Sequence, residues 1–235
     1  MPERQEADGG AHRSYRYHPT RVAIETQALH IVEENGMTTA SNNSLRKQLL
    51  NSIEKLELEI IHPNRPNPTP QMCEFLIAGE DRRFHYHPGV DLFALCRAAW
   101  KTVFCGSRQG ASTIAMQLVR TITGHYEKTW RRKIVEIFLA MYLSKYVSKD
   151  RLPILYLSVA YYGWGMNNFR QACSRLRIDP MTMSAFEAAK LVARIKYPEP
   201  KRLVARRSKR IHQRAVHLMT LAGYADEIPT FLRGY

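Results

Sequence analysis

The stretch Gly110-Ala-Ser-Thr-Ile-Ala-Met-Gln-Leu-Val-Arg120 decides how this sequence is interpreted. A glycine-containing loop enters an apolar helix at Ser112 and Thr113, whose backbone N–H groups and hydroxyls can hold phosphate oxygens. Gln117 and Arg120 follow about one and two turns later, roughly along the same helix face. Taken alone, the pattern favours a plainer interpretation, in which a capped core helix leaves Gln117 and Arg120 in solvent.

A second group of polar residues lies upstream, in Glu80-Asp-Arg-Arg-Phe-His-Tyr-His-Pro-Gly-Val-Asp91. It joins two predicted helices, so it is a loop held by rigid elements, and Pro88-Gly89 requires a turn. Glu80 follows an apolar stretch, residues 75–78, and partial desolvation of its carboxylate would favour general-base chemistry. The plainer interpretation is that the acidic pair neutralises the two arginines after it, while Asp91 only caps a helix.

A third group, Lys128-Thr-Trp-Arg-Arg-Lys-Ile-Val-Glu136, lies downstream. Arg132 and Glu136 are four residues apart, so they share a helix face. The plain interpretation is a surface ion pair worth roughly a few tenths of a kcal/mol. The sharper interpretation is a carboxylate inside a cationic cluster, which could bind a pyrophosphate and stabilise it as a leaving group.

The rest of the chain predicts a mainly α protein, because apolar residues recur at helical spacing and only residues 22–32 suggest a strand. Ser44 is expected to cap the first helix, and Ser184 to open a capping box with Glu187. In the helix after Asp91, one apolar face is expected to point inward, namely Leu92, Leu95, Ala99 and Val103. The expected helices span 42–61, 71–79, 91–104, 112–122, 127–147, 149–161, 167–176, 184–195 and 206–222.

Composition narrows the class of partner. The 235 residues include 35 basic and 21 acidic side chains, a formal net charge of +14. That excess predicts a polyanionic partner, which can be a nucleic acid, an anionic membrane surface or a phosphorylated substrate. The four cysteines form no pattern typical of a zinc site or a disulfide framework, and neither a transmembrane helix nor a secretory signal is visible.

Together and in this order, the three groups resemble motifs of the peptidoglycan glycosyltransferases, glycosyltransferase family 51. These occur as monofunctional enzymes and as the first catalytic domain of class A penicillin-binding proteins. Residues 80–91 are similar to the motif EDxxFxxHxGxD, residues 110–117 to GxSTIxxQ and residues 132–136 to RKxxE. Residues 149–165 and 187–198 resemble the fourth and fifth blocks. The resemblance covers about 69–200 and continues weakly to the C-terminus.

The resemblance implies an enzyme that polymerises lipid II into β-1,4 glycan with inversion and releases undecaprenyl pyrophosphate. Glu80 would be the general base that deprotonates the acceptor hydroxyl. Glu136 would be a second acidic residue that positions the acceptor or assists departure of the pyrophosphate. The residues expected to bind substrate by the same resemblance are Asp81, Phe84, His87, Ser112, Thr113, Gln117, Arg120, Lys128, Arg132 and Lys133.

The implied fold is a lysozyme-like helical lobe with a smaller jaw lobe that faces the membrane. Phe93, Trp100, Lys101 and Phe104 are the residues expected to contact the bilayer, unless they are ordinary core residues. The expected division is a mobile tail over 1–20, an N-terminal flanking segment over 21–68 and a transglycosylase domain over 69–235.

No cofactor is required, no metal-binding residue is assigned, and a divalent cation, Mg²⁺ or Mn²⁺, is used by some family members. The expected partners are lipid II, undecaprenyl-pyrophosphate-linked glycan, the membrane surface and cell-wall synthesis proteins, but no nucleic acid. The expected location is peripheral, on the periplasmic face of the inner membrane, although the sequence shows no anchor for it.

Some residues depart from the family pattern, which keeps competing functions open. Met116 replaces a glutamine, and changes in the fourth block place Pro153, Ile154 and Ser158 where Leu, Glu and Asn are usual. These changes permit a catalytically impaired homologue that acts as a cell-wall scaffold. A lysozyme-like glycan hydrolase also stays open. So does a nucleic-acid-binding protein, since residues 194–214 hold nine basic side chains against one acidic.

Overall fold

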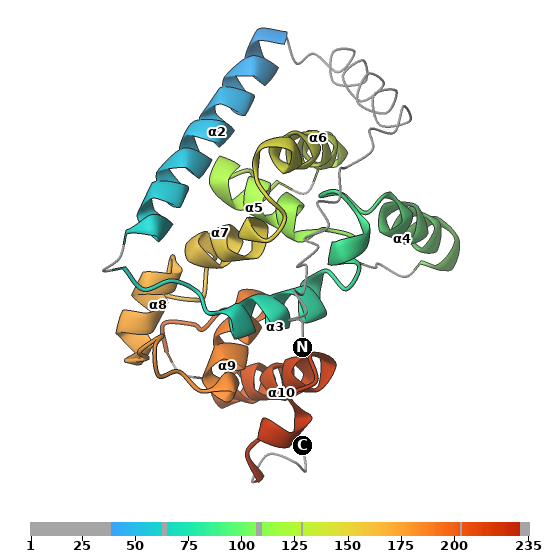
Figure 1. Ribbon diagram of the computed structural model, residues 1–235. Helices are drawn as coiled ribbons and strands as arrows, with labels where there is room; N and C mark the ends of the chain where they lie inside the picture. Colours follow the sequence, from blue (N-terminus) through green and yellow to red (C-terminus); the bar gives the residue numbers. More distant parts are fainter. Residues whose placement is uncertain (1–38, 63–64, 107–109, 128, 203, 231–235) are drawn as a thin grey trace, which may run out of the picture.

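The computed structural model describes residues 39–62, 65–106, 110–127, 129–202 and 204–230 (Figure 1). Over these residues the regular structure is entirely helical: nine α-helices, two short 3-10 helices and no strand. The predicted mainly α class is therefore confirmed. The predicted tail over 1–20 and the strand near 22–32 lie outside the described residues.

The first described helix, α2 (Thr39–Ile61), runs along the outside of three later helices, α5 (Ile114–Thr123), α6 (Trp130–Tyr146) and α7 (Arg151–Val159) (Figure 1). It buries Leu49 and Ile53 against them. Its Arg46 guanidinium lies over the ring of Phe138, 4.5 Å from the centroid. The prediction that Ser44 caps this helix is wrong, because the helix begins five residues earlier and Ser44 lies inside it.

A second group of helices consists of α3 (Pro70–Glu80), α9 (Ala185–Lys196) and α10 (Ala205–Leu221), which pack on one another. Thr69 caps α3 and Pro70 occupies its first position, where a missing N–H costs nothing. The capping box between Ser184 and Glu187 is present as predicted. Two smaller elements complete this half: α8 (Phe169–Leu176) and the 3-10 helix η2 (Ala225–Glu227).

Helix α5 lies in the centre, packed against α2, α6 and α7. Six consecutive residues from Ile114 to Val119 are buried, so the helix has almost no solvent face. Its cap is Thr113, whose hydroxyl accepts from the Met116 N–H at 3.3 Å, so the helix begins at Ile114 and not at Ser112 as predicted. The Ser112 hydroxyl is therefore available for contacts with other elements.

Helix α4 (Leu92–Cys105) stands beside the main bundle (Figure 1) and contains no buried residue. Asp91 caps it as predicted, accepting from the Ala94 N–H at 3.0 Å. The prediction that its apolar face points inward is wrong for most of that face: Val103 is 74% exposed and Leu92 44% exposed. Of the four predicted residues, only Leu95 is partly buried and packs against the core. Helical periodicity locates an apolar stripe but does not say what covers it. No described helix is both long and apolar enough to span a bilayer.

Candidate active site

Glu80 is the last residue of α3, and two long-range donors fix its carboxylate. Gln117 Nε2 donates to Oε2 at 3.3 Å and Arg214 Nη2 donates to Oε1 at 3.1 Å. Arg214 comes from α10 and also donates to the Gly79 carbonyl at 2.9 Å. The Glu80 side chain is 24% exposed, so it is held in place and still accessible. The local pairing with the following arginines does not occur, because Arg83 instead pairs with Asp91 at 2.8 Å.

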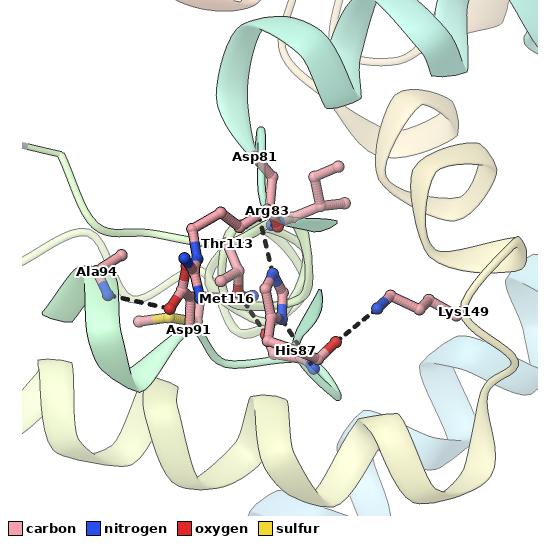
Figure 2. A network of polar contacts seen from close by, with 10 residues as sticks. Asp81, Arg83, His87, Asp91, Ala94, Thr113, Met116 and Lys149 are labelled. Carbon is pink, nitrogen blue, oxygen red and sulfur yellow. Dashed lines mark hydrogen bonds and ion pairs between the residues drawn. The ribbon is translucent and has the colours of Figure 1, made fainter. Parts of the chain in front are cut away.

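The loop after Glu80 is held from inside by Asp81 and His87 (Figure 2). Asp81 accepts from the Ile114 N–H at 3.1 Å, and its other oxygen lies 2.9 Å from His87 Nε2. The Gly89 N–H donates to His87 Nδ1 at 3.1 Å. Because Nδ1 accepts, the ring proton is on Nε2 and is donated to Asp81. The loop is thereby joined to the first turn of α5.

A second set of contacts closes the same loop against neighbouring elements (Figure 2). The Thr113 hydroxyl donates to the Gly89 carbonyl at 2.5 Å, and Lys149 Nζ donates to the His87 carbonyl at 2.6 Å. Lys149 also lies 5.0 Å from the ring centroid of Phe84, in the 3-10 helix η1 (Phe84–Tyr86). The loop is thus fixed to both α5 and the segment before α7.

The second acid, Glu136, is 3% exposed and lies inside a cluster of cations on α6. Arg132 Nη1 donates to one carboxylate oxygen, and Lys133 Nζ donates to the other at 3.1 Å. Lys133 also donates to the Ser112 hydroxyl at 2.8 Å. Burial lowers the pKa of Lys133, with a further reduction from Arg120 and Arg132 and an opposing increase from Glu136.

A cavity of about 390 Å³ opens beside this cluster. One part of its wall is charged, from Arg120, Arg131, Arg132 and Glu136, and another part is apolar. The apolar wall comes from α2, α5 and α6, namely Leu45, Val119, Val135 and Leu139. A cavity with both characters suits a ligand that joins an anionic group to a hydrocarbon chain.

The structure thus connects both acids to the α5 segment, Glu80 through Gln117 and Glu136 through Lys133 and Ser112. Five of the residues expected to bind substrate are instead buried, namely Asp81, Phe84, His87, Thr113 and Gln117. Burial favours a supporting role for the first four, whereas Gln117 still reaches the accessible Glu80 carboxylate. Lys128 lies outside the described residues. The departures from the family pattern sit in packed positions, with Met116 and Pro153 buried and Ser158 donating to the Ile154 carbonyl at 2.8 Å.

Two residues near Glu80 are not distinguished by the sequence. Arg214 is one of nine basic residues in its stretch, and no local signal separates it from the others. Tyr156 of α7 is buried, and burial raises the pKa of its hydroxyl well above the usual value, with a smaller increase from Glu80. Tyr156 lies in the fourth block of the family resemblance. Its membership of that block is the signal in the sequence that could have identified it.

The described residues contain no group of three or more His, Cys, Asp or Glu side chains placed to hold a metal ion. Both acids are already bonded to cationic side chains, Glu80 to Arg214 and Glu136 to Arg132 and Lys133.

Comparison with known proteins places this geometry in context. Residues 47–222 match the family described as transglycosylase. Penicillin-binding protein 1F of Bacillus subtilis is 31% identical over 145 residues, covering 61% of this chain and 20% of the relative. Penicillin-binding protein 1A of Escherichia coli is 39% identical over 119 residues, covering 49% and 14%.

A third relative is closer to this chain in length. The protein named "Putative transglycosylase H16_A0665" of Cupriavidus necator is 33% identical over 147 residues, covering 61% of this chain and 62% of the relative. The chain therefore spans a fifth or less of the two penicillin-binding proteins and under two thirds of the third relative.

Proposed function

The chain belongs to the transglycosylase family, and from that premise we propose that it is a peptidoglycan glycosyltransferase that polymerises lipid II. The cavity beside Glu136 carries this proposal. It places arginines next to an apolar wall that includes α2, and lipid II joins a pyrophosphate to a polyprenyl chain. Such a substrate needs both surfaces within one site.

In the proposed reaction Glu80 accepts the proton of the GlcNAc 4-hydroxyl on the acceptor. The hydroxyl oxygen attacks the anomeric carbon of the donor MurNAc from the face opposite the pyrophosphate. The new C1–O4 bond forms as the C1–O bond to the pyrophosphate breaks, which inverts the anomeric carbon. Gln117 and Arg214 support this role, because they orient the carboxylate and leave it accessible.

The leaving group is undecaprenyl pyrophosphate, which needs charge neutralisation rather than a proton. Arg120 and Arg132 line the cavity, and Lys133 lies beside them, bonded to Glu136. Lys128 is proposed to join them. Glu136 is buried and already bridges two of the cations, so we assign it to holding them for the departing pyrophosphate. Ser112 and Gln117 are proposed to hold the donor.

Helix α4 is proposed as the membrane-contacting part of the enzyme. Phe93, Trp100 and Phe104 are 60%, 62% and 67% exposed, with Lys101 on the same helix. Exposed aromatic side chains next to a cation are typical of a surface that lies in the lipid headgroup region. This location would place the site where lipid II is held, at the periplasmic face of the inner membrane.

Incubation of the purified protein with lipid II tests the proposal. We expect long glycan strands, and we expect moenomycin, an inhibitor of the family's donor site, to block their formation. If the protein only shortens preformed glycan, it is a hydrolase. If it retains DNA at moderate salt and leaves lipid II unchanged, it is a nucleic-acid-binding protein. If it binds lipid II without converting it, it acts as a scaffold.

A further inference from the structure

A second, smaller cavity of about 100 Å³ lies between the end of α9 and the start of α10. It shares no lining residue with the cavity beside Glu136. Pro200, Val204 and Ile211 form part of its wall. The remaining lining residues are polar or charged: Arg194, Glu199, Arg207, Ser208 and His212. Its volume is that of roughly three water molecules in the liquid, enough for a small oxyanion.

The charges around this cavity are only partly balanced. Glu199 accepts from Arg194 Nε at 2.7 Å, and Arg194 also donates to the Lys190 carbonyl at 3.0 Å. The Arg207 residue is half-buried, and its guanidinium has neither a hydrogen bond nor an ion pair with any part of the chain that the structure describes. Glu199, the acidic residue of this cavity, is paired with Arg194 instead. The cavity therefore carries one uncompensated positive charge.

Two further groups supply hydrogen bonds. His212 Nδ1 lies 2.8 Å from the Ser208 carbonyl. A carbonyl can only accept, so Nδ1 carries the proton, and Nε2 keeps a lone pair that can accept from a protonated phosphate oxygen. The Ser208 hydroxyl is only 3.5 Å from the same Nδ1, a weak contact that leaves its proton available. A ligand here would meet a guanidinium, a hydroxyl and an imidazole.

We propose that this cavity is a binding site for a phosphate group, outside the catalytic centre. The planar fork of Arg207 matches two phosphate oxygens, and the Ser208 hydroxyl can donate to a third. Exposed cations that neighbour its lining residues in the sequence would raise the local concentration of anions, namely Lys196, Lys201, Arg202, Arg206 and Arg210. The phosphate can be free or part of a phospholipid headgroup.

The test follows the His212 ring by NMR while inorganic phosphate is added to the full-length protein. The His212 signals are assigned by their absence in His212→Gln. We expect a saturable shift with phosphate that sodium chloride of equal ionic strength does not produce. We expect Arg207→Gln to weaken phosphate binding about tenfold or more. Arg206→Gln is the matched control, because its exposed side chain does not line the cavity, and it should bind as the wild type does.

Further arms of the experiment identify the source of the phosphate and show whether phosphate binding depends on the active site. Vesicles of phosphatidylglycerol that shift the His212 signals where free phosphate does not would identify the headgroup as the source. Glu80→Gln should bind phosphate normally, so the result is independent of polymerisation. The proposal is overturned if neither probe shifts His212, or if Arg206→Gln and Arg207→Gln weaken binding equally. Ser208→Ala provides a second test should Arg207→Gln unfold.

Discussion

Arg214 of α10 donates to the Glu80 carboxylate at 3.1 Å, joining the last helix of the domain to the end of α3. The same guanidinium nitrogen donates to the Gly79 carbonyl at 2.9 Å, so Arg214 holds both the side chain and the backbone before it. Its own side chain is 12% exposed. A residue 134 positions away in the sequence thus determines where the proposed general base lies.

Replacement of Arg214 by Met should lower kcat about ten- to a hundredfold, because a charge-assisted hydrogen bond to Glu80 is lost. KM should change little, since Arg214 is a positioning residue that acts through Glu80. Arg214→Lys should restore part of the rate. Arg210→Met is the matched control: it lies one turn earlier, is exposed and contacts the Tyr197 ring. Equal kinetics for Arg214→Met and wild type would contradict the assignment.

The pH dependence of polymerisation should reveal Lys133. Burial lowers its pKa below that of an ordinary lysine, so as the pH rises it loses its charge, and its support of the pyrophosphate, earlier than an exposed lysine. Lys133→Arg stays charged at alkaline pH and should extend activity to higher pH. Lys190 also has a pKa lowered by burial but lies on α9, so Lys190→Arg should leave the profile unchanged. A profile that is identical for wild type and Lys133→Arg would exclude this role.

Gly89 tests how tightly the loop behind Glu80 is closed. Its φ is +139°, and an added Cβ would lie 1.9 Å from Ser144 Oγ. Gly89→Ala should therefore reduce the free energy of unfolding by about 2–4 kcal/mol. Gly106 also has positive φ, but no atom of the described residues lies within 4 Å of a Cβ added there, and Gly106→Ala should cost only about 1 kcal/mol. Urea denaturation measures the free energy of unfolding of both variants. Equal losses would show that the loop has room for a Cβ at position 89.

The exposed face of α4 should carry membrane binding. Trp100 and Phe104 stack with ring centroids 4.1 Å apart and neither is buried. Changing both to Ser should leave thermal stability unaltered. It should lower affinity for phosphatidylglycerol vesicles about tenfold or more, since each aromatic ring contributes roughly 1.5–3 kcal/mol when buried. Tyr146→Ser, at a 61% exposed aromatic on α6, is the control and should bind vesicles as wild type does.

Local sequence signals predict the helices well where caps and periodicity agree. Asp91 accepts from the first turn of α4 and the capping box of α9 is present, both as predicted. Thr69 and Asn168 cap α3 and α8 in the same way, although neither was predicted as a cap. These interactions span only a few residues, so the sequence reports them directly. The predicted start of α5 at Ser112 is two residues early, because Ser112 and Thr113 are equally good caps and only the hydrogen bond from Thr113 to the Gly89 carbonyl distinguishes them.

Contacts that depend on tertiary structure could not be predicted from the sequence. The apolar stripe of α4 has the pattern of a core helix, yet it has no partner among the described residues that buries it. The ion pair of Arg214 with Glu80 joins residues far apart in the chain. The domain boundary at residue 69 stays a prediction, although α2, on its far side, packs against α5, α6 and α7. The family resemblance predicts that Asp81 and His87 bind substrate. Both are buried, which a motif of polar residues does not reveal.

The rate of lipid II polymerisation by Glu80→Gln tests the central claim most directly. Glutamine keeps the size and the hydrogen-bonding oxygen but cannot accept the acceptor's proton. We expect the rate to fall about 100- to 10,000-fold while the fold is retained, with only a small loss of thermal stability because one of the two donors, Gln117 or Arg214, loses its acceptor oxygen. Glu54→Gln, at an exposed position of α2, should polymerise as the wild type does. A Glu80→Gln protein that makes glycan as fast as the wild type would contradict the account.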